Sequence, residues 1–218
     1  MKEHAVSANA PFVDPISDEG FLQIFGNEAN KVVVIDFLNT ILEGLEVICD
    51  LQHLPVGSHS LNGEILLDLL CTDEKGEHFL VHLQRSEWLT PDGSLMYHGA
   101  RLILKQPKEV KEDYLERVYS VGIMNHQLPP NEVRSSIQKT QAILSIGTRE
   151  QGLIYKVTLL LNMIELPRFR KKEQELRTHL DKWLFLLQNI SGMQEIPAAM
   201  KGSRFEKLFR AAASPTAP

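Results

Sequence analysis

The stretch NGEILLDLLCTDEKGEHFLVHLQR, residues 62–85, has the pattern of two strands joined by a tight turn. Its first half is a run of leucine and isoleucine side chains that a single acid, Asp68, interrupts. Residues 73–76 (DEKG) have the composition of a turn, and Gly76 can adopt the positive φ angle that the last position of a three-residue hairpin loop requires. Residues 78–84 then alternate between the two faces of a strand. The stretch therefore predicts a β-hairpin.

The register of this hairpin decides which polar side chains meet. If Glu74, Lys75 and Gly76 form the loop, Asp68 lies opposite His82. Opposed residues on antiparallel strands have Cβ atoms about 5 Å apart, which is close enough for two side chains to share a metal ion. Gln84 lies one step further along the same face. Because a slip of one residue would move His82 to the other face, the predicted site depends on this register.

Composition favours an ordinary globular protein. The chain has 218 residues, of which 43% are hydrophobic and 23% are charged, and this length suits one domain with a full-sized core. The net charge of −5 and the pI of about 5.9 exclude a strongly basic nucleic-acid-binding protein. A DNA-binding surface would have to be a local basic patch. Both cysteines, Cys49 and Cys71, lie in apolar runs, and we expect them to be buried free thiols.

The chain shows no targeting or membrane signal. The first residues, MKEHAVSANAPF, contain no apolar segment that resembles a signal peptide. The longest apolar run, residues 157–161, is far too short to span a bilayer. We therefore expect a protein of the cytoplasm without membrane contact.

The order of predicted elements indicates an α/β (α+β) fold with a mixed central β-sheet flanked by helices. We expect residues 1–11 to be disordered, residues 12–190 to form one domain, and residues 191–218 to add a short helix and a disordered tail. Helices are predicted at residues 17–25, 30–42, 90–106, 171–189 and around 205–209, and strands at residues 46–54, 64–71, 78–84, 117–125, 138–148 and 153–166.

Three segments carry a resemblance to a known family. Asp68 is followed fourteen positions later by His82-Leu83-Gln84, which resembles the active-site hairpin of the PD-(D/E)XK nucleases, and most of all their transposase branch, the recombination-promoting nucleases. Residues 36–44 (DFLNTILEG) and residues 165–169 (ELPRF) are similar to two further motifs of that branch. The resemblance spans about residues 11–212. It implies a restriction-endonuclease-like core and a metal-dependent DNA endonuclease that acts on double-stranded DNA in recombination or transposition.

The resemblance also assigns roles within the hairpin. It implies that Asp68 binds a divalent metal, Mg²⁺ or Mn²⁺, and that Gln84 positions the attacking water. The family has a glutamate where this chain has His82, so His82 or Glu64 would complete the metal shell. A neutral imidazole suits Zn²⁺, Co²⁺ or Ni²⁺ better than Mg²⁺. Ser94 stands where the family usually has an arginine upstream of a tyrosine, so a positive charge is missing there.

Other interpretations of these residues stay open. Asp68 can be a structural acid that hydrogen-bonds His82, and Glu165 can be a structural partner of Arg168 or Arg170. The basic run Arg168, Arg170, Lys171 and Lys172 either touches DNA phosphates or begins a solvated helix. Three functions follow: an endonuclease, a non-catalytic DNA-binding or remnant form of a mobile-element protein, and an interaction domain that forms a homodimer through residues 171–189.

Overall fold

The computed structural model describes residues 11–55, 65–86, 91–106, 116–127, 138–148 and 153–214. The chain folds as two compact units. The sheet unit is Gly44–Arg168, and the helical unit joins Met1–Glu43 to Phe169–Pro218. In the described part of the chain, no helix is long and apolar enough to cross a bilayer. The predicted domain limits at residues 12 and 190 stay a prediction, and most of the predicted disordered ends lie outside the described residues.

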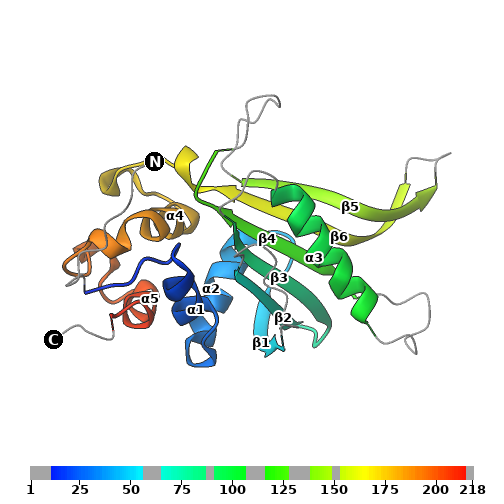
Figure 1. The fold of residues 1–218 in the computed structure, drawn as a ribbon, viewed down its shortest axis with the longest axis horizontal. Helices are drawn as coiled ribbons and strands as arrows, with labels where there is room; N and C mark the ends of the chain where they lie inside the picture. Colours follow the sequence, from blue (N-terminus) through cyan, green and yellow to red (C-terminus); the bar gives the residue numbers. More distant parts are fainter. Residues whose placement is uncertain are drawn as a thin grey trace. The chain divides into compact units, whose positions relative to one another are not determined.

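A six-stranded mixed sheet forms the sheet unit, as the sequence predicts (Figure 1). The strand order is β1-β2-β3-β4-β6-β5. The β3–β4 and β4–β6 pairs are parallel, and the other three pairs are antiparallel. The strands are β1 (Ile48–Leu54), β2 (Ile65–Asp73), β3 (His78–Ser86), β4 (Val118–Met124), β5 (Gln138–Thr148) and β6 (Leu153–Glu165).

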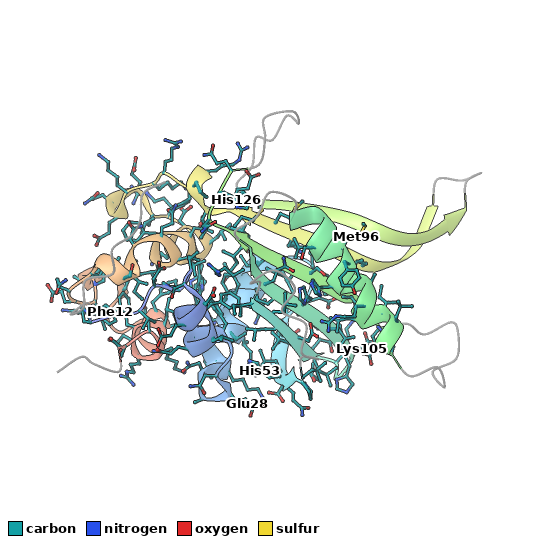
Figure 2. The ribbon with its side chains drawn as sticks, in the orientation of Figure 1. Phe12, Glu28, His53, Met96, Lys105 and His126 are labelled. Carbon is teal, nitrogen blue, oxygen red and sulfur yellow. The ribbon has the colours of Figure 1, made fainter. Side chains whose placement is uncertain are left out.

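One helix of the sheet unit, α3 (Pro91–Lys105), lies across β3, β4 and β6 (Figure 1). Its buried leucines, Leu95 and Leu102, join a core with side chains of β4 and β6. Met96 and Lys105, which Figure 2 labels on this helix, are exposed to solvent. The helix thus covers one face of the central strands, as its amphipathic sequence requires.

The hairpin of β2 and β3 has the predicted register. The Asp73 N–H donates to the Glu77 carbonyl at 3.0 Å, which closes the turn, and Gly76 has a φ angle of +79°. The Asp68 backbone pairs with the His82 backbone. Because side chains alternate along a strand, this register fixes both side chains on the same face of the sheet.

The helical unit confirms most of the predicted helix limits. Ser17 caps the first helix, because its hydroxyl accepts a hydrogen bond of 3.0 Å from the Gly20 N–H. The α-helices are α1 (Asp18–Phe25), α2 (Lys31–Ile41), α4 (His179–Asn189) and α5 (Phe205–Ala211). Short 3₁₀ helices are η1 (Glu28–Asn30), η3 (Glu173–Glu175), η4 (Ile190–Gly192) and η5 (Ala198–Met200), and the sheet unit ends on η2 (Leu166–Arg168).

The prediction of a helix over residues 171–189 is wrong in its first part. Helix α4 begins at His179, and residues 171–178 contain only the turn of η3. Thr178 ends the non-helical segment: its hydroxyl accepts from the Asp181 N–H at 3.0 Å, and the Asp181 carboxylate accepts from the Thr178 N–H at 3.1 Å. This capping box fixes the start of the helix, although the leucine spacing extends further upstream.

The prediction of two buried cysteines is also wrong for Cys49, which is exposed. A register shift between Ile48 and Asp50 interrupts the pairing of β1 with β2, and such a bulge changes the side-chain alternation at Cys49. Cys71 is buried as predicted, and burial raises the pKa of its thiol to about 12. A thiol with this pKa carries almost no nucleophilic thiolate at neutral pH.

Candidate functional site

The hairpin brings the three predicted site residues together in one buried chain of contacts. His82 lies in the middle, with its Nδ1 2.9 Å from Asp68 Oδ1 and its Nε2 2.9 Å from Gln84 Oε1. The exposed fraction of Asp68 is 2%, and His82 and Gln84 are fully buried. Each ring nitrogen of His82 thus contacts one neighbouring side chain of the hairpin.

Helix α3 adds a second row of polar side chains, and each one contacts one hairpin side chain. The three stand at spacings of four and three residues, so they share one face of the helix. The pairs are Ser94 with Gln84 (Oγ to Nε2, 3.4 Å), His98 with His82 (ring centroids 5.0 Å apart) and Arg101 with Asp68 (Nη2 to Oδ2, 2.6 Å). The candidate site is thus a two-layer polar network between a hairpin and a helix.

Electrostatics keep Asp68 ionised. Burial raises the pKa of its carboxyl group, but the hydrogen bond and charge of His82 and the charge of Arg101 outweigh burial and hold the pKa below its usual value. The pKa of His98 is lowered as well, but in a histidine a lower pKa favours the neutral ring. Burial, together with the charges of His82 and Arg101, lowers the pKa of His98 to about 4, so this ring is neutral at pH 7.

Comparison with protein-family models identifies the family of this chain. Residues 15–216 match the model of the PD-(D/E)XK nuclease family transposases. The chain belongs to this family. Comparisons with curated proteins and with solved structures give no significant match. Membership agrees with the mixed α+β sheet architecture and with the resemblance that the hairpin, the residue 36–44 segment and the residue 165–169 segment carry.

PD-(D/E)XK nucleases generally use a divalent metal, and the residues of this hairpin do not fit one. Both carboxylate oxygens of Asp68 are already engaged, one by His82 and the other by Arg101. Among the described residues, no three His, Cys, Asp or Glu side chains converge as a metal site requires. Mg²⁺ demands several oxygen ligands in octahedral geometry, which one occupied carboxylate cannot supply. Glu64, the alternative carboxylate, lies outside the described residues.

Sequence reasoning missed His98 and Arg101. It treated Ser94 only as the place of an absent arginine and read the rest of α3 as a covering helix. A signal was present: Ser94, His98 and Arg101 form a polar stripe at i, i+4 and i+7 on a helix whose other buried positions include Leu95 and Leu102. A basic residue on the buried side of a helix requires an acidic partner, and Asp68 is the buried acid of the neighbouring strand.

The basic run after β6 is partly neutralised within each unit. In the sheet unit, Arg168 Nε donates to Glu165 Oε2 at 2.7 Å, which is one of the two pairings that the sequence suggests. In the helical unit, Lys171 Nζ lies 2.8 and 2.9 Å from the two carboxylate oxygens of Asp181. Arg170 and Lys172 are exposed. The run therefore presents fewer available charges than its sequence indicates.

Proposed function

We propose that this protein is a non-catalytic member of the PD-(D/E)XK nuclease family transposases that binds double-stranded DNA without hydrolysing it. One observation carries the proposal: the two oxygens of Asp68, the residue that the family resemblance assigns to the metal, are engaged by His82 at 2.9 Å and Arg101 at 2.6 Å.

The chemistry of phosphodiester hydrolysis supports this proposal. The reaction needs a metal ion to stabilise the developing charge and to lower the pKa of the attacking water. A histidine at position 82 removes one of the two carboxylates that would attract such an ion. Gln84 Oε1 lies 2.9 Å from His82 Nε2, and Gln84 Nε2 donates to Ser94 Oγ at 3.4 Å, so both ends of this amide have partners in the network. The side chains that would bind metal and orient water are instead in contact with one another.

Family membership and the exposed basic residues support DNA as the ligand. The net charge of −5 is unfavourable for contact with a polyanion, so binding depends on a local patch. Arg170, Lys171 and Lys172 are exposed, but Lys171 forms an ion pair with Asp181, which leaves Arg170 and Lys172 as the better candidates. We propose that they contact DNA phosphates, while Arg168 and Lys171 contribute less because carboxylates neutralise them.

A metal-dependent endonuclease is the second candidate function, and the hairpin register favours it. Asp68 lies opposite His82 in the paired strands, and Gln84 follows on the same face, as in the active hairpin that the family resemblance implies. In this account Asp68 would exchange Arg101 for Mn²⁺ or Mg²⁺, His82 would be a tolerated ligand, and Gln84 would position a water.

Plasmid cleavage and DNA binding, measured on the same preparations, separate the two functions. The proteins are the wild type, Asp68→Ala and His82→Glu, each with Mg²⁺ and with Mn²⁺. The proposal predicts no nicking by the wild type and salt-sensitive binding to double-stranded DNA that Asp68→Ala preserves. Nicking by the wild type that Asp68→Ala abolishes would establish the endonuclease instead. A concentration-dependent mass without DNA affinity would favour the interaction-domain hypothesis and its homodimer.

A further inference from the structure

We propose that Arg101 is the resident cation of this centre: it neutralises Asp68 from within the chain and, with His82, keeps divalent metal ions out. This inference rests on the proposed non-catalytic function for its biological meaning. The exclusion of metal itself can be measured in the absence of DNA. The inference gives α3 a specific role, which is to supply the positive charge that family members take from a metal.

The ion pair between Arg101 and Asp68 is short and shielded from water. Arg101 Nη2 lies 2.6 Å from Asp68 Oδ2, and the exposed fractions of the two side chains are 14% and 2%. The other oxygen of Asp68 is 2.9 Å from His82 Nδ1. An ionised carboxylate has about four lone-pair sites, and here one nitrogen lies within hydrogen-bond distance of each oxygen. A divalent ion bound to Asp68 would therefore lie close to the positive charge of Arg101, which repels it.

Helix α3 packs closely against the sheet next to Arg101. Gly99, two residues before Arg101, lies against β4 and β6: a Cβ atom at Gly99 would be 2.5 Å from Ser120 Oγ and 2.5 Å from Leu159 Cδ1. The absence of a side chain at residue 99 therefore allows the close approach of the helix to the sheet. This approach places Arg101 within reach of Asp68.

The balance of charge also opposes a divalent ion. One carboxylate and one guanidinium already cancel, so an added divalent ion would meet no uncompensated negative charge in the network. His98 does not help, because its ring stacks on His82 with an interplanar angle of 21° instead of converging on Asp68. Replacing His82 with glutamate and removing the charge of Arg101 would leave two carboxylates on adjacent strands, which is a donor set that suits Mn²⁺ or Mg²⁺.

Metal binding by the full-length protein, without DNA, tests the inference. Mn²⁺ is titrated into the wild type, Arg101→Met, His82→Glu and the Arg101→Met/His82→Glu double variant, and bound ion is measured by electron paramagnetic resonance and by the shift in thermal unfolding. We expect no binding by the wild type at about 1 mM Mn²⁺. The double variant should bind, and its melting temperature should rise by several degrees because a ligand that binds only the folded state stabilises it.

Two matched controls make the result specific to Arg101. Arg117→Met in the His82→Glu background removes another partly buried arginine of the sheet unit, which pairs with Glu46 and Glu77, and it should bind far less Mn²⁺ than the Arg101→Met/His82→Glu variant. In the His82→Glu background, Arg101→Lys keeps a cation beside Asp68 and should bind at least tenfold more weakly than Arg101→Met. Two results would overturn the inference: Mn²⁺ binding by the wild type that Asp68→Ala removes, or failure of the folded double variant to bind Mn²⁺. DNA binding plays no part in either result, so the proposed function stands or falls separately.

Discussion

The rings of His82 on β3 and His98 on α3 stack with their centroids 5.0 Å apart and an interplanar angle of 21°. Both side chains are buried, and the exposed fraction of His98 is only 3%. His82 occupies the centre of the hydrogen-bonded chain, while His98 covers it from the helix. A neutral ring is the form of His98 that this position favours, because burial and the charges of His82 and Arg101 oppose its protonation.

This position of His98 predicts a pH dependence of stability. The folded-state pKa of about 4 lies below the ordinary value of 6.5, so the unfolded state binds the proton first as the pH falls. The free energy of unfolding should therefore decrease between pH 6.5 and pH 4, by up to about 3 kcal/mol in total. His98→Phe keeps a stacked ring and removes the titration, so urea unfolding should show a flatter profile in this window. An unchanged slope would contradict the neutral, buried histidine.

Close packing of α3 on the sheet predicts that Gly99→Ala is destabilising. The new Cβ atom would meet Ser120 Oγ and Leu159 Cδ1, each at 2.5 Å, and relief of this overlap should cost about 1–3 kcal/mol of unfolding free energy. Gly192→Ala is the matched control, because no atom outside its immediate neighbours lies within 4 Å of the added Cβ. Thermal unfolding of both variants measures the difference. Equal stability of the two would show that α3 does not approach the sheet so closely.

The capping box at the start of α4 should contribute to the unfolding free energy of the helical unit in a way that is lost in acid. Burial raises the pKa of Asp181, but Lys171 and the backbone N–H groups of Arg177 and Thr178 outweigh this and lower the pKa to about 2. The pKa of Asp181 in the folded state lies below the ordinary 3.8. The stability that its carboxylate provides is therefore present above pH 3.8 and is lost as the pH falls to about 2. Asp181→Asn should lower the unfolding free energy at pH 7 by about 2 kcal/mol. The exposed Glu175→Gln should cost much less.

The exposed part of the basic run predicts a change in the salt dependence of DNA binding. Each phosphate contact that is lost reduces the slope of log K against log salt by about 0.9 in magnitude. The Arg170→Gln/Lys172→Gln variant should therefore reduce the slope by about 2 in fluorescence anisotropy titrations. Lys207→Gln, an exposed lysine on α5, is the control and should reduce it less. Equal effects of the two variants would remove the basic run from the DNA interface.

The sequence predicted the hairpin because local turn chemistry specifies it. Gly76 at the end of a polar loop fixes the register, and the register alone places Asp68 opposite His82. The starts of the helices after Ser17 and Thr178 show that the capping residue decides where a helix begins. At Ser17 the cap and the apolar spacing agree, so the prediction was correct. At Thr178 they conflict: the leucine spacing extended the predicted helix upstream to residue 171, but the capping box starts the helix after Thr178.

The helix half of the site could not be predicted in the same way. The contacts of His98 and Arg101 depend on how α3 crosses β3 and β4, and this crossing is set by Gly99 and by long-range packing. The local pattern shows that the helix has a polar stripe, but the strand that this stripe meets is decided by long-range packing. For this reason the roles of Asp68, His82 and Gln84 looked like those of a metal site, while the cation that completes the network is 33 residues further along the chain from Asp68.

A double-mutant cycle between Asp68 and Arg101 tests most directly whether the chain neutralises its own candidate metal ligand. The unfolding free energies of the wild type, Asp68→Asn, Arg101→Met and the double variant are measured in urea at pH 7 without metal. Each single change should cost about 3–5 kcal/mol, because removal of one partner leaves a buried group unpaired. The double variant should cost less than the sum by at least about 2 kcal/mol. Additive costs, with no coupling between the two residues, would contradict the account.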